Sequence, residues 1–276
     1  MILALDIGGT KLAFALWDGT NLLERQQIPT PADRSPEHLL TVCLDLIQPQ
    51  LPQARAIRVA ACGAVADGIV TALNNETLHN WHNGINVAAW LTQKTNLETK
   101  VLNDADAAAW GEFKLGAGRG TRDFAFVTVS TGIGGGLVIG KQLHTTPHGL
   151  HAEFGFTLTD SDTPLEYLAS GSALDKLARQ HAWADSRELL QQALLGNQIA
   201  LVILENSAAR VARLLANLRT VLGIERAAIG GGLGLAPTYL ERVRAHLQRF
   251  GMPWASLELA SAELGADAGL VGVAVY

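Results

Sequence analysis

The sequence is poor in cysteine, in basic runs and in long apolar segments, and each shortage excludes a class of site or of protein. Cys43 and Cys62 are the only cysteines among 276 residues, which excludes a disulfide framework and a cysteine-rich metal site. The net charge is −5 and no long basic run is present, so the electrostatic footprint of sequence-independent nucleic-acid binding is missing. No uncharged apolar stretch of about 18 residues predicts a membrane span.

The remaining composition is that of a chain with a large core. Hydrophobic residues make up 48% of the chain and charged residues 17%, which excludes global disorder. The N-terminus opens with a strand-like run at residues 2–5 and lacks the basic start and cleavage site of a signal peptide. We therefore expect a reduced, cytoplasmic protein with one large domain, or two smaller domains that share a cleft.

The most informative stretch is ALDIGGTKLAFAL, residues 4–16. An apolar run ends in Asp6, turns through Gly8 and Gly9, and resumes as a second apolar run. Such a glycine turn can press backbone N–H groups against a phosphate, and Asp6 is placed to reach a magnesium ion or its water shell. A simple hairpin is the alternative, and for one cluster alone it is the favoured interpretation.

The same pattern returns twice. FVTVSTGIGGGLVIG, residues 126–140, again passes from an apolar run through Ser130 and Thr131 into a glycine turn. AIGGGLG, residues 228–234, follows another short apolar run. Glycine is required where a ligand approaches the main chain closely. Three clusters, each directly after a strand-like run, favour phosphate binding over turn formation alone.

The order of apolar patterns predicts an α/β fold. Strands are expected over residues 2–6, 12–17, 22–28 and 57–61. A helix is expected to begin at Pro36, and others over residues 199–222, 237–250 and 267–275, the first of these three stopped by Gly223. The best boundary lies near residue 102, which gives lobes 1–102 and 103–264. The C-terminal helix, about 265–276, is expected to pack back on the first lobe.

A second chemical feature is NDADAAAWGEF, residues 103–113. Asn103 and Asp104 stand where a strand passes into a helix, and the helix dipole there favours a carboxylate. A helix cap alone is the alternative explanation. Two carboxylates and an amide within four positions exceed what one cap requires. Asp104 is the candidate general base, whereas Asp106 is interpreted as a cap or scaffold residue.

A third feature is the pair Glu153 and Glu166 in the stretch 151–174. Carboxylates accept hydrogen bonds from neighbouring hydroxyls, so a polyol ligand would explain both residues. For Glu166 the alternative, slightly preferred without context, is a favourable first-turn acid on a helix that runs to Leu177.

Other polar and aromatic residues point to packing rather than chemistry. His144, His148 and His151 form a loose cluster, but no cysteine or well-spaced carboxylate completes a metal site there. Trp81 is expected to pack in a loop, and a sugar-stacking role for it has no support.

Together these motifs resemble the ROK family of bacterial sugar kinases, within the actin/hexokinase-like superfamily. Five motifs occur in the family's order and span nearly the whole chain: DIGGTKL, NDADAAAWGEF, VSTGIGGG, GGGLGLAPTYL and DAGLVGVA. Within the family, the similarity is greatest to members that act on N-acetylmannosamine. The resemblance implies two ribonuclease H-like lobes with a central cleft, which explains why residues 126–140 repeat the pattern of residues 4–16.

The resemblance also implies roles for the matched positions. Asp104 would take the proton from a sugar 6-hydroxyl as that hydroxyl attacks the γ-phosphoryl of ATP. Asp6 would lie near Mg²⁺. The sugar would be held by Gly63, Thr77, Asn103, Asp104, Glu153 and Glu166. The nucleotide would be lined by Gly8, Gly9, Thr10, Lys11, Thr131, Gly132, Gly231 and Gly232.

The expected reaction is therefore ATP-dependent phosphorylation of an amino sugar or hexose. N-acetyl-D-mannosamine, converted to its 6-phosphate in sialic acid catabolism, is the first choice. Alternatives are a glucokinase-like hexose kinase and a non-catalytic paralogue that binds sugar and ATP. Family repressors carry a DNA-binding segment ahead of the kinase-like body, which we do not expect here. The resemblance implies a homodimer, with no nucleic-acid or membrane partner.

Two departures from the family pattern affect the acceptor side. Most members carry a histidine shortly after the Glu153 position and a cysteine-rich loop, which together bind zinc. Here Phe156 stands at the histidine position, and the short loop between Thr157 and Glu166 has no cysteine, so no structural zinc is expected. Thr77 stands where the family usually has an asparagine for the sugar. The acceptor pocket is therefore expected to be altered, while the nucleotide side is intact.

Overall fold

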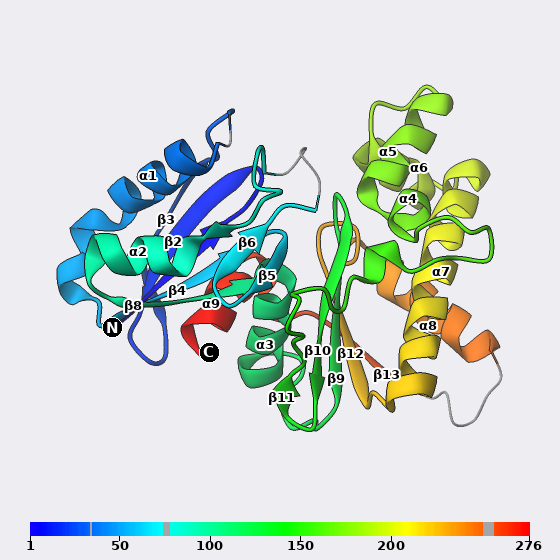
Figure 1. Cartoon of the computed structure of the whole chain (residues 1–276). Coiled ribbons are helices and arrows are strands. Elements are labelled where there is room, and N and C mark those ends of the chain that lie inside the picture. Colours follow the sequence, from blue (N-terminus) through cyan, green and yellow to red (C-terminus); the bar gives the residue numbers. More distant parts are fainter. Residues whose placement is uncertain (34, 74–77, 251–256) are drawn as a thin grey trace. The chain divides into compact units, whose positions relative to one another are not determined.

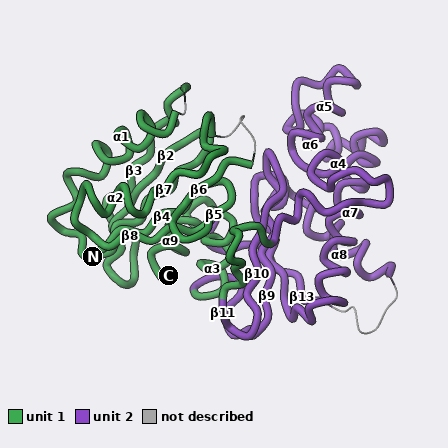
Figure 2. The backbone as a smooth tube through the Cα atoms, viewed as in Figure 1, with its two compact units in different colours: residues 1–114, 143–151, 266–276 green, residues 115–142, 152–265 purple. Residues whose placement is uncertain are grey.

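The computed structural model describes residues 1–33, 35–73, 78–250 and 257–276. These residues form two compact units (Figure 2). Unit 1 comprises Met1–Lys114, Leu143–His151 and Ala266–Tyr276, and unit 2 comprises Leu115–Gln142 and Ala152–Gly265. Residues 103–114 and 143–151 thus group with the first unit, whereas the sequence-based division placed them in the second lobe.

Unit 1 is built on a five-stranded sheet of order β3-β2-β1-β4-β8 (Figure 1). Strand β1 is antiparallel to β2 and parallel to β4, which is parallel to β8. The sheet strands are β1 (Ile2–Ile7), β2 (Lys11–Trp17), β3 (Leu22–Pro29), β4 (Ala56–Ala61) and β8 (Glu98–Asn103). A small sheet contains β5 (Ala64–Ala66), β6 (Ile69–Thr71) and β7 (Ile85–Asn86). The helices are α1 (Pro36–Ile47), η1 (Gln48–Gln53), α2 (Val87–Thr95), α3 (Asp104–Leu115), η4 (Gly265–Asp267) and α9 (Ala268–Ala274).

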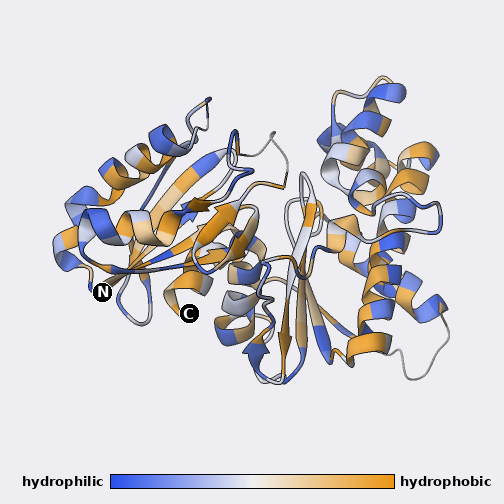
Figure 3. Ribbon diagram, in the orientation of Figure 1, coloured by the Kyte–Doolittle hydropathy of each residue, from blue (hydrophilic) through white to orange (hydrophobic). Residues whose placement is uncertain are grey.

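The two faces of strand β1 bury residues of different size. Leu3, Leu5 and Ile7 belong to a cluster that includes the buried side chains of α1 and α2. Ala4 lies on the opposite face, in a cluster with residues of α9. Alternation along a strand produces this division, and the small residues admit helices close to the sheet. Helix α1 begins at Pro36 as predicted and carries hydrophobic and hydrophilic faces (Figure 3).

Helix α9 packs against α3 with almost no space between the two backbones. A Cβ atom added to Gly272 would lie 1.6 Å from the carbonyl oxygen of Ala107. A Cβ atom on Gly111 would lie 2.7 Å from the carbonyl oxygen of Ala268. Only glycine fits at these two positions, so the sequence of both helices sets how closely they approach.

Unit 2 repeats the same plan. Its sheet has the order β11-β10-β9-β12-β13, with β9 antiparallel to β10 and parallel to β12. The strands are β9 (Phe124–Val129), β10 (Ile133–Ile139), β11 (Gln142–Leu143), β12 (Arg226–Gly230) and β13 (Glu258–Ser261). The helices are η2 (Phe154–Phe156), α4 (Glu166–Ala169), α5 (Gly171–Gln180), α6 (Ser186–Leu194), α7 (Gln198–Leu222) and α8 (Tyr239–Arg249). The shared strand order agrees with the two similar lobes that the family resemblance implies.

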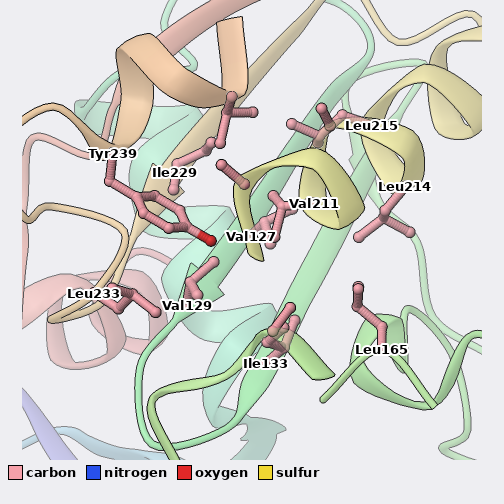
Figure 4. Close-up of a cluster of buried hydrophobic side chains, with 14 of the residues drawn as sticks. Val127, Val129, Ile133, Leu165, Val211, Leu214, Leu215, Ile229, Leu233 and Tyr239 are labelled. Carbon is pink, nitrogen blue, oxygen red and sulfur yellow. The ribbon is translucent and has the colours of Figure 1, made fainter. Parts of the chain in front are cut away.

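The core of unit 2 lies between its sheet and helix α7. Val127 and Val129 of the sheet pack with Val211 and Leu215 of α7, and the ring of Tyr239 lies among them (Figure 4). Helix α7 ends where predicted, because Gly223 adopts the left-handed conformation with φ of 72°. Among the described residues, no helix is both long and apolar enough to span a membrane.

The expected continuous helix from Glu166 to Leu177 is wrong. The chain leaves helical geometry at Ser170, whose ψ is 168°, and a second helix starts at Gly171. The hydroxyl of Ser170 caps this second helix by accepting a 3.2 Å hydrogen bond from the N–H of Ala173. A tertiary contact fixes the break, because the N–H of Gly171 donates to the carbonyl oxygen of Ser130 at 2.6 Å.

Candidate active site

In unit 1 the candidate residues gather at the carboxyl ends of three parallel strands. Ala61, the last residue of β4, is paired with Ile7 of β1 and with Asn103 of β8. Asp6 precedes the end of β1, Gly63 follows β4, and Asn103 closes β8. This edge is where open α/β sheets bind their ligands. Asp6, Gly63 and Asn103, which the sequence analysis named, therefore lie at one edge of this sheet.

Asn103 fixes the start of helix α3. Its Oδ1 atom accepts hydrogen bonds from the N–H groups of Ala105 and Asp106, at 2.8 and 3.1 Å. Its Nδ2 atom donates to the carbonyl oxygen of Gly63 at 2.9 Å. The helix cap is thus Asn103, which rules out the cap alternative for Asp106 and leaves the scaffold alternative.

Asp104 is the first residue of α3 and is partly buried. Its pKa is raised above the usual value, mainly by burial, with a further contribution from the negative charge of Asp106. A hydrogen bond of 2.9 Å from the N–H of Ala105 to Oδ1 opposes this shift. A carboxylate with a raised pKa accepts a proton more readily than one at the ordinary value.

The pKa of Asp6 is strongly raised. Burial raises the pKa to about 7, the charge of Asp104 adds to the shift, and Lys11 and Arg25 oppose it. A cation near Asp6 would offset the free energy that burial of the ionised carboxylate costs. No group of three histidine, cysteine or acidic residues in the described part of the chain forms a metal cage. Mg²⁺ characteristically takes one or two carboxylates together with phosphates and water, and Asp6 fits that partial role.

The first glycine turn joins β1 to β2. The N–H of Gly8 donates to the carbonyl oxygen of Lys11 at 3.1 Å, and a Cβ atom on Gly8 would lie 2.9 Å from that oxygen. The hydroxyl of Thr30 donates to the carbonyl oxygen of Gly8 at 2.7 Å. Gly9 and Thr10 form the tip of this turn, and Thr10 is exposed.

In unit 2 the other two glycine turns lie at the ends of neighbouring parallel strands. The turn at Thr131 and Gly132 follows β9, and the turn at Gly231 and Gly232 follows β12. Gly231 has φ of 83°, and its backbone lies against the carbonyl oxygen of Val129. Gly232 has no atom within 4 Å of an added Cβ, so its backbone has open space beside it.

Glu166 lies directly against the turn after β9. Its Oε2 atom accepts a 2.7 Å hydrogen bond from the N–H of Ile133. Glu153 precedes the short helix η2, and its carbonyl oxygen accepts a 3.0 Å hydrogen bond from the N–H of Phe156. Gly155, between them in sequence, packs against Glu166, since its added Cβ would lie 3.2 Å from Oε2. Glu153 thus lies two residues before a glycine whose backbone packs against Glu166.

The loop from Thr157 to Glu166 is held by hydroxyl and backbone bonds. Leu158 and Pro164 form an isolated bridge. The hydroxyl of Thr159 donates to the carbonyl oxygen of Thr163 at 3.0 Å. The loop has neither cysteine nor histidine, so its residues do not fit the family's structural zinc. Phe156, at the start of this loop, is 45% exposed.

Three further residues singled out in the sequence analysis are Thr77, Trp81 and His151. Thr77 lies outside the described residues. Trp81 is fully buried in the core of unit 1, which confirms a packing role. The Nε2 atom of His151 forms a buried hydrogen bond with Oδ2 of Asp106, which the sequence analysis missed. No local pattern could have revealed this pair, because 45 residues separate its members.

The comparisons with known proteins decide the family. A model described as "ROK family" matches residues 2–276. The chain belongs to the ROK family. An N-acetylmannosamine kinase of Shigella flexneri is 37% identical over 286 residues, which cover 99% of this chain and 97% of the relative. An N-acetylmannosamine kinase of Salmonella typhi has the same identity and coverage.

Solved structures of ROK proteins share the fold. A ROK family glucokinase from Streptomyces griseus, in complex with glucose and AMPPNP, is similar with a TM-score of 0.84 and 27% identity. The match covers 99% of this chain and 98% of that one. A ROK hexokinase from Thermus thermophilus has a TM-score of 0.86 and 29% identity, with coverage of 99% and 96%. These matches confirm the two-lobed α/β fold expected from the motifs.

Proposed function

We propose that this ROK protein is a sugar kinase that transfers the γ-phosphoryl group of ATP to the 6-hydroxyl of N-acetyl-D-mannosamine. The observation that carries the proposal is Asp104 at the start of α3, a partly buried carboxylate with a raised pKa at the carboxyl edge of the sheet. Full-length relatives named N-acetylmannosamine kinase support the choice of acceptor.

For this phosphoryl transfer the protein must mainly position the two substrates and neutralise the charge on the phosphates. Asp104 accepts the proton of the acceptor hydroxyl as its oxygen attacks the γ-phosphorus, and the bond from that phosphorus to the bridging oxygen of ADP breaks. The Nδ2 atom of Asn103 donates one hydrogen bond to the carbonyl oxygen of Gly63 and can donate its second to a sugar hydroxyl. Glu153 and Glu166 accept hydrogen bonds from other sugar hydroxyls.

The glycine turns supply backbone contacts to the nucleotide. The residues proposed to line the phosphates are Gly8, Gly9, Thr10, Lys11, Thr131 and Gly132. Gly231 and Gly232 are proposed to approach the nucleoside. Mg²⁺, when bound, neutralises charge on the phosphates. Asp6 is the residue that would hold it or its water shell.

The proposal extends to the setting of the reaction. We infer a homodimer that acts in the cytoplasm on small molecules, with ATP as donor and Mg²⁺ as the cation. The product, N-acetyl-D-mannosamine 6-phosphate, belongs to sialic acid catabolism.

Phe156 is the observation that favours a second candidate acceptor, a plain hexose such as glucose. This exposed aromatic side chain follows Glu153 by three residues and replaces a polar residue of the family. An acetamido sugar and a plain hexose differ only at C2, and one pocket residue can decide between them. The solved relative from Streptomyces griseus is a glucokinase with bound glucose.

An ADP-release assay across five sugars tests the proposal. N-acetyl-D-mannosamine, N-acetyl-D-glucosamine, glucose, mannose and fructose are compared by kcat/KM with MgATP as donor. We expect the highest value for N-acetyl-D-mannosamine. A higher value for glucose would make the protein a hexose kinase. Turnover of none of the sugars, with ATP binding retained in calorimetry, would make it a non-catalytic binding protein.

A further inference from the structure

A pocket in unit 2 is formed between a loop and one face of helix α7. Its lining residues belong to 157–165 and 206–222, whereas the glycine turns of this unit lie at 131–132 and 231–232. The pocket has a volume of about 400 Å³. Small-molecule sites have volumes of roughly 300–1,000 Å³, so this pocket is large enough to hold a ligand of its own.

The loop that forms one wall of this pocket is held in place by its own backbone and by α7. The N–H of Leu165 donates to the carbonyl oxygen of Thr157 at 2.9 Å, which closes the loop at its two ends. The Nη1 atom of Arg213 lies 3.2 Å from Oδ2 of Asp160 and connects α7 to the loop. Because both walls are ordered without a ligand, binding does not have to meet the entropic cost of ordering the loop.

Leucine and valine side chains form the apolar part of the lining. Leu165 of the loop and Leu214 of α7 belong to the buried core of unit 2 (Figure 4). Leu158 and Val221, in contrast, are 68% and 77% exposed, and Leu222 is 40% exposed. Large apolar side chains that remain exposed around a pocket mark a binding site. The apolar part of a ligand would remove them from water.

The polar part of the lining includes a guanidinium group with an unused donor. The Nε atom of Arg210 is buried and has no hydrogen-bond partner among the described residues. Its Nη1 atom donates to the carbonyl oxygen of Asn206 at 3.0 Å. Asp160, the acidic residue of the lining, pairs with Arg213 instead. Guanidinium groups bind carboxylates through paired N–H donors, so the charge and the unused donor of Arg210 suit an anionic ligand.

We propose that this pocket binds small carboxylates with an apolar body, such as fatty acids of medium chain length. The carboxylate lies against the guanidinium of Arg210, and the apolar body covers the exposed side chains of Leu158, Val221 and Leu222. The head group provides the selectivity, because an uncharged ligand cannot form the charge-assisted bond and a cation would be repelled. The site lies within unit 2 and does not depend on the sugar kinase function proposed above.

Titration calorimetry of the purified full-length protein with three ligands of equal chain length tests the proposal. Octanoate, octan-1-ol and octylamine share the apolar body and differ in the charge of the head group. We expect wild-type protein to bind octanoate with a Kd at least about tenfold lower than that of octan-1-ol, as a hydrogen bond to a charged group provides. Octylamine should bind more weakly than octan-1-ol. This comparison requires no variant, so it does not depend on the folding of any variant.

Three variants then locate the site. Arg210→Met keeps an unbranched apolar side chain and removes the guanidinium, so the Kd for octanoate should rise about tenfold or more while that for octan-1-ol stays within about twofold. Arg187→Met is the matched control, because it removes the same charge from α6, outside the lining, and should change neither value. Ala209→Trp fills the pocket and keeps Arg210, so both ligands should bind at least about tenfold more weakly.

Failure of wild-type protein to bind octanoate would overturn the proposal, as would equal affinities for octanoate and octan-1-ol. Octanoate binding that is unchanged in folded Arg210→Met or Ala209→Trp protein would place the ligand elsewhere, and the proposal would again be wrong. If octanoate does not bind and Ala209→Trp converts a dimer into a monomer in analytical ultracentrifugation, the pocket is a contact between two copies of the chain. Sugar phosphorylation is not measured in these titrations, so the proposed function and this site stand or fall separately.

Discussion

The Oε2 atom of Glu166 accepts a 2.7 Å hydrogen bond from the backbone N–H of Ile133, the residue that follows the glycine turn after β9. The same oxygen lies where a side chain at Gly132 would begin, 2.4 Å from an added Cβ. A candidate sugar carboxylate and a candidate phosphate turn are therefore in direct contact within unit 2. A change in the turn must move the carboxylate.

Gly132→Ala tests this contact. The new methyl group displaces the Glu166 carboxylate, because an added Cβ would meet Oε2 at 2.4 Å. We expect the acceptor KM to rise by about tenfold and the unfolding free energy to fall by about 1–3 kcal/mol, as in other overpacked sites. Steady-state kinetics and denaturant titration measure both effects. An acceptor KM equal to wild type would show that Glu166 does not bind the sugar.

Gly232→Ala tests the nucleotide side and contrasts with Gly132→Ala. Its added Cβ meets no atom of the protein within 4 Å, so stability should stay within about 0.5 kcal/mol of wild type. If the nucleotide approaches this backbone, the methyl group obstructs it and the KM for ATP rises, with the acceptor KM unaffected. Calorimetry with AMPPNP provides an independent measurement. Unaltered nucleotide binding would remove Gly232 from the site.

Asp104→Asn tests the general base. The amide keeps the shape of the side chain but cannot accept the hydroxyl proton, so kcat should fall by about 10²-fold or more. ATP affinity should remain close to wild type. Single-turnover measurements report the chemical step directly. Turnover comparable to wild type would leave Asp104 with only a structural role at the start of α3.

Asp6 predicts a pH dependence of stability in the ligand-free protein. Because its pKa is raised from 3.8 to about 7, the folded state retains a proton that the unfolded state releases between these values. The unfolding free energy therefore falls as pH rises from about 4 to about 7, by on the order of a few kcal/mol from this group. Asp6→Asn should remove this part of the slope. Urea titrations across that pH range measure it, and parallel curves for the two proteins would contradict the assignment.

Two glycines of helix α9 form a matched pair for the packing of α9 on α3. Gly272→Ala places a methyl group 1.6 Å from the carbonyl oxygen of Ala107, so we expect a loss of about 3 kcal/mol or more. Gly269→Ala meets its nearest atoms at 3.9 Å and should gain up to about 1 kcal/mol from helix propensity. Thermal melting compares the two. Equal melting temperatures would show that the helices are not packed this closely.

The sequence located those turns and helix starts that local patterns determine. Gly8, Gly132 and Gly231 follow apolar strands in each case, so their turns could be recognised without knowledge of the fold. Asn103 and Asp104 stand at a strand-to-helix junction, which the hydrophobic periodicity also locates. The family resemblance implied two similar lobes, but the strand order of their sheets came only from the structure.

Long-range contacts determine the features that the sequence analysis missed. The break at Ser170 depends on the bond from Gly171 to Ser130, which no helical pattern contains. The pairing of Asp106 with His151 joins positions 45 residues apart, so no local pattern contains it. Backbone packing at Gly272 likewise depends on a neighbour distant in the chain.

The close approach of α9 to α3 also affects how the protein can be engineered. Trp110 of α3 donates a 3.3 Å hydrogen bond to the carbonyl oxygen of Val275, so even the penultimate residue is tied to the helix that begins at Asp104. Removing the last ten residues would expose the alanine side chains of the unit 1 sheet that pack against α9, namely Ala4, Ala13, Ala15 and Ala60. It would also remove the contacts that α9 makes with α3, the helix that begins with Asp104. Purification tags and reporter fusions at Tyr276 therefore need a flexible spacer, and turnover should be measured with and without the appended sequence.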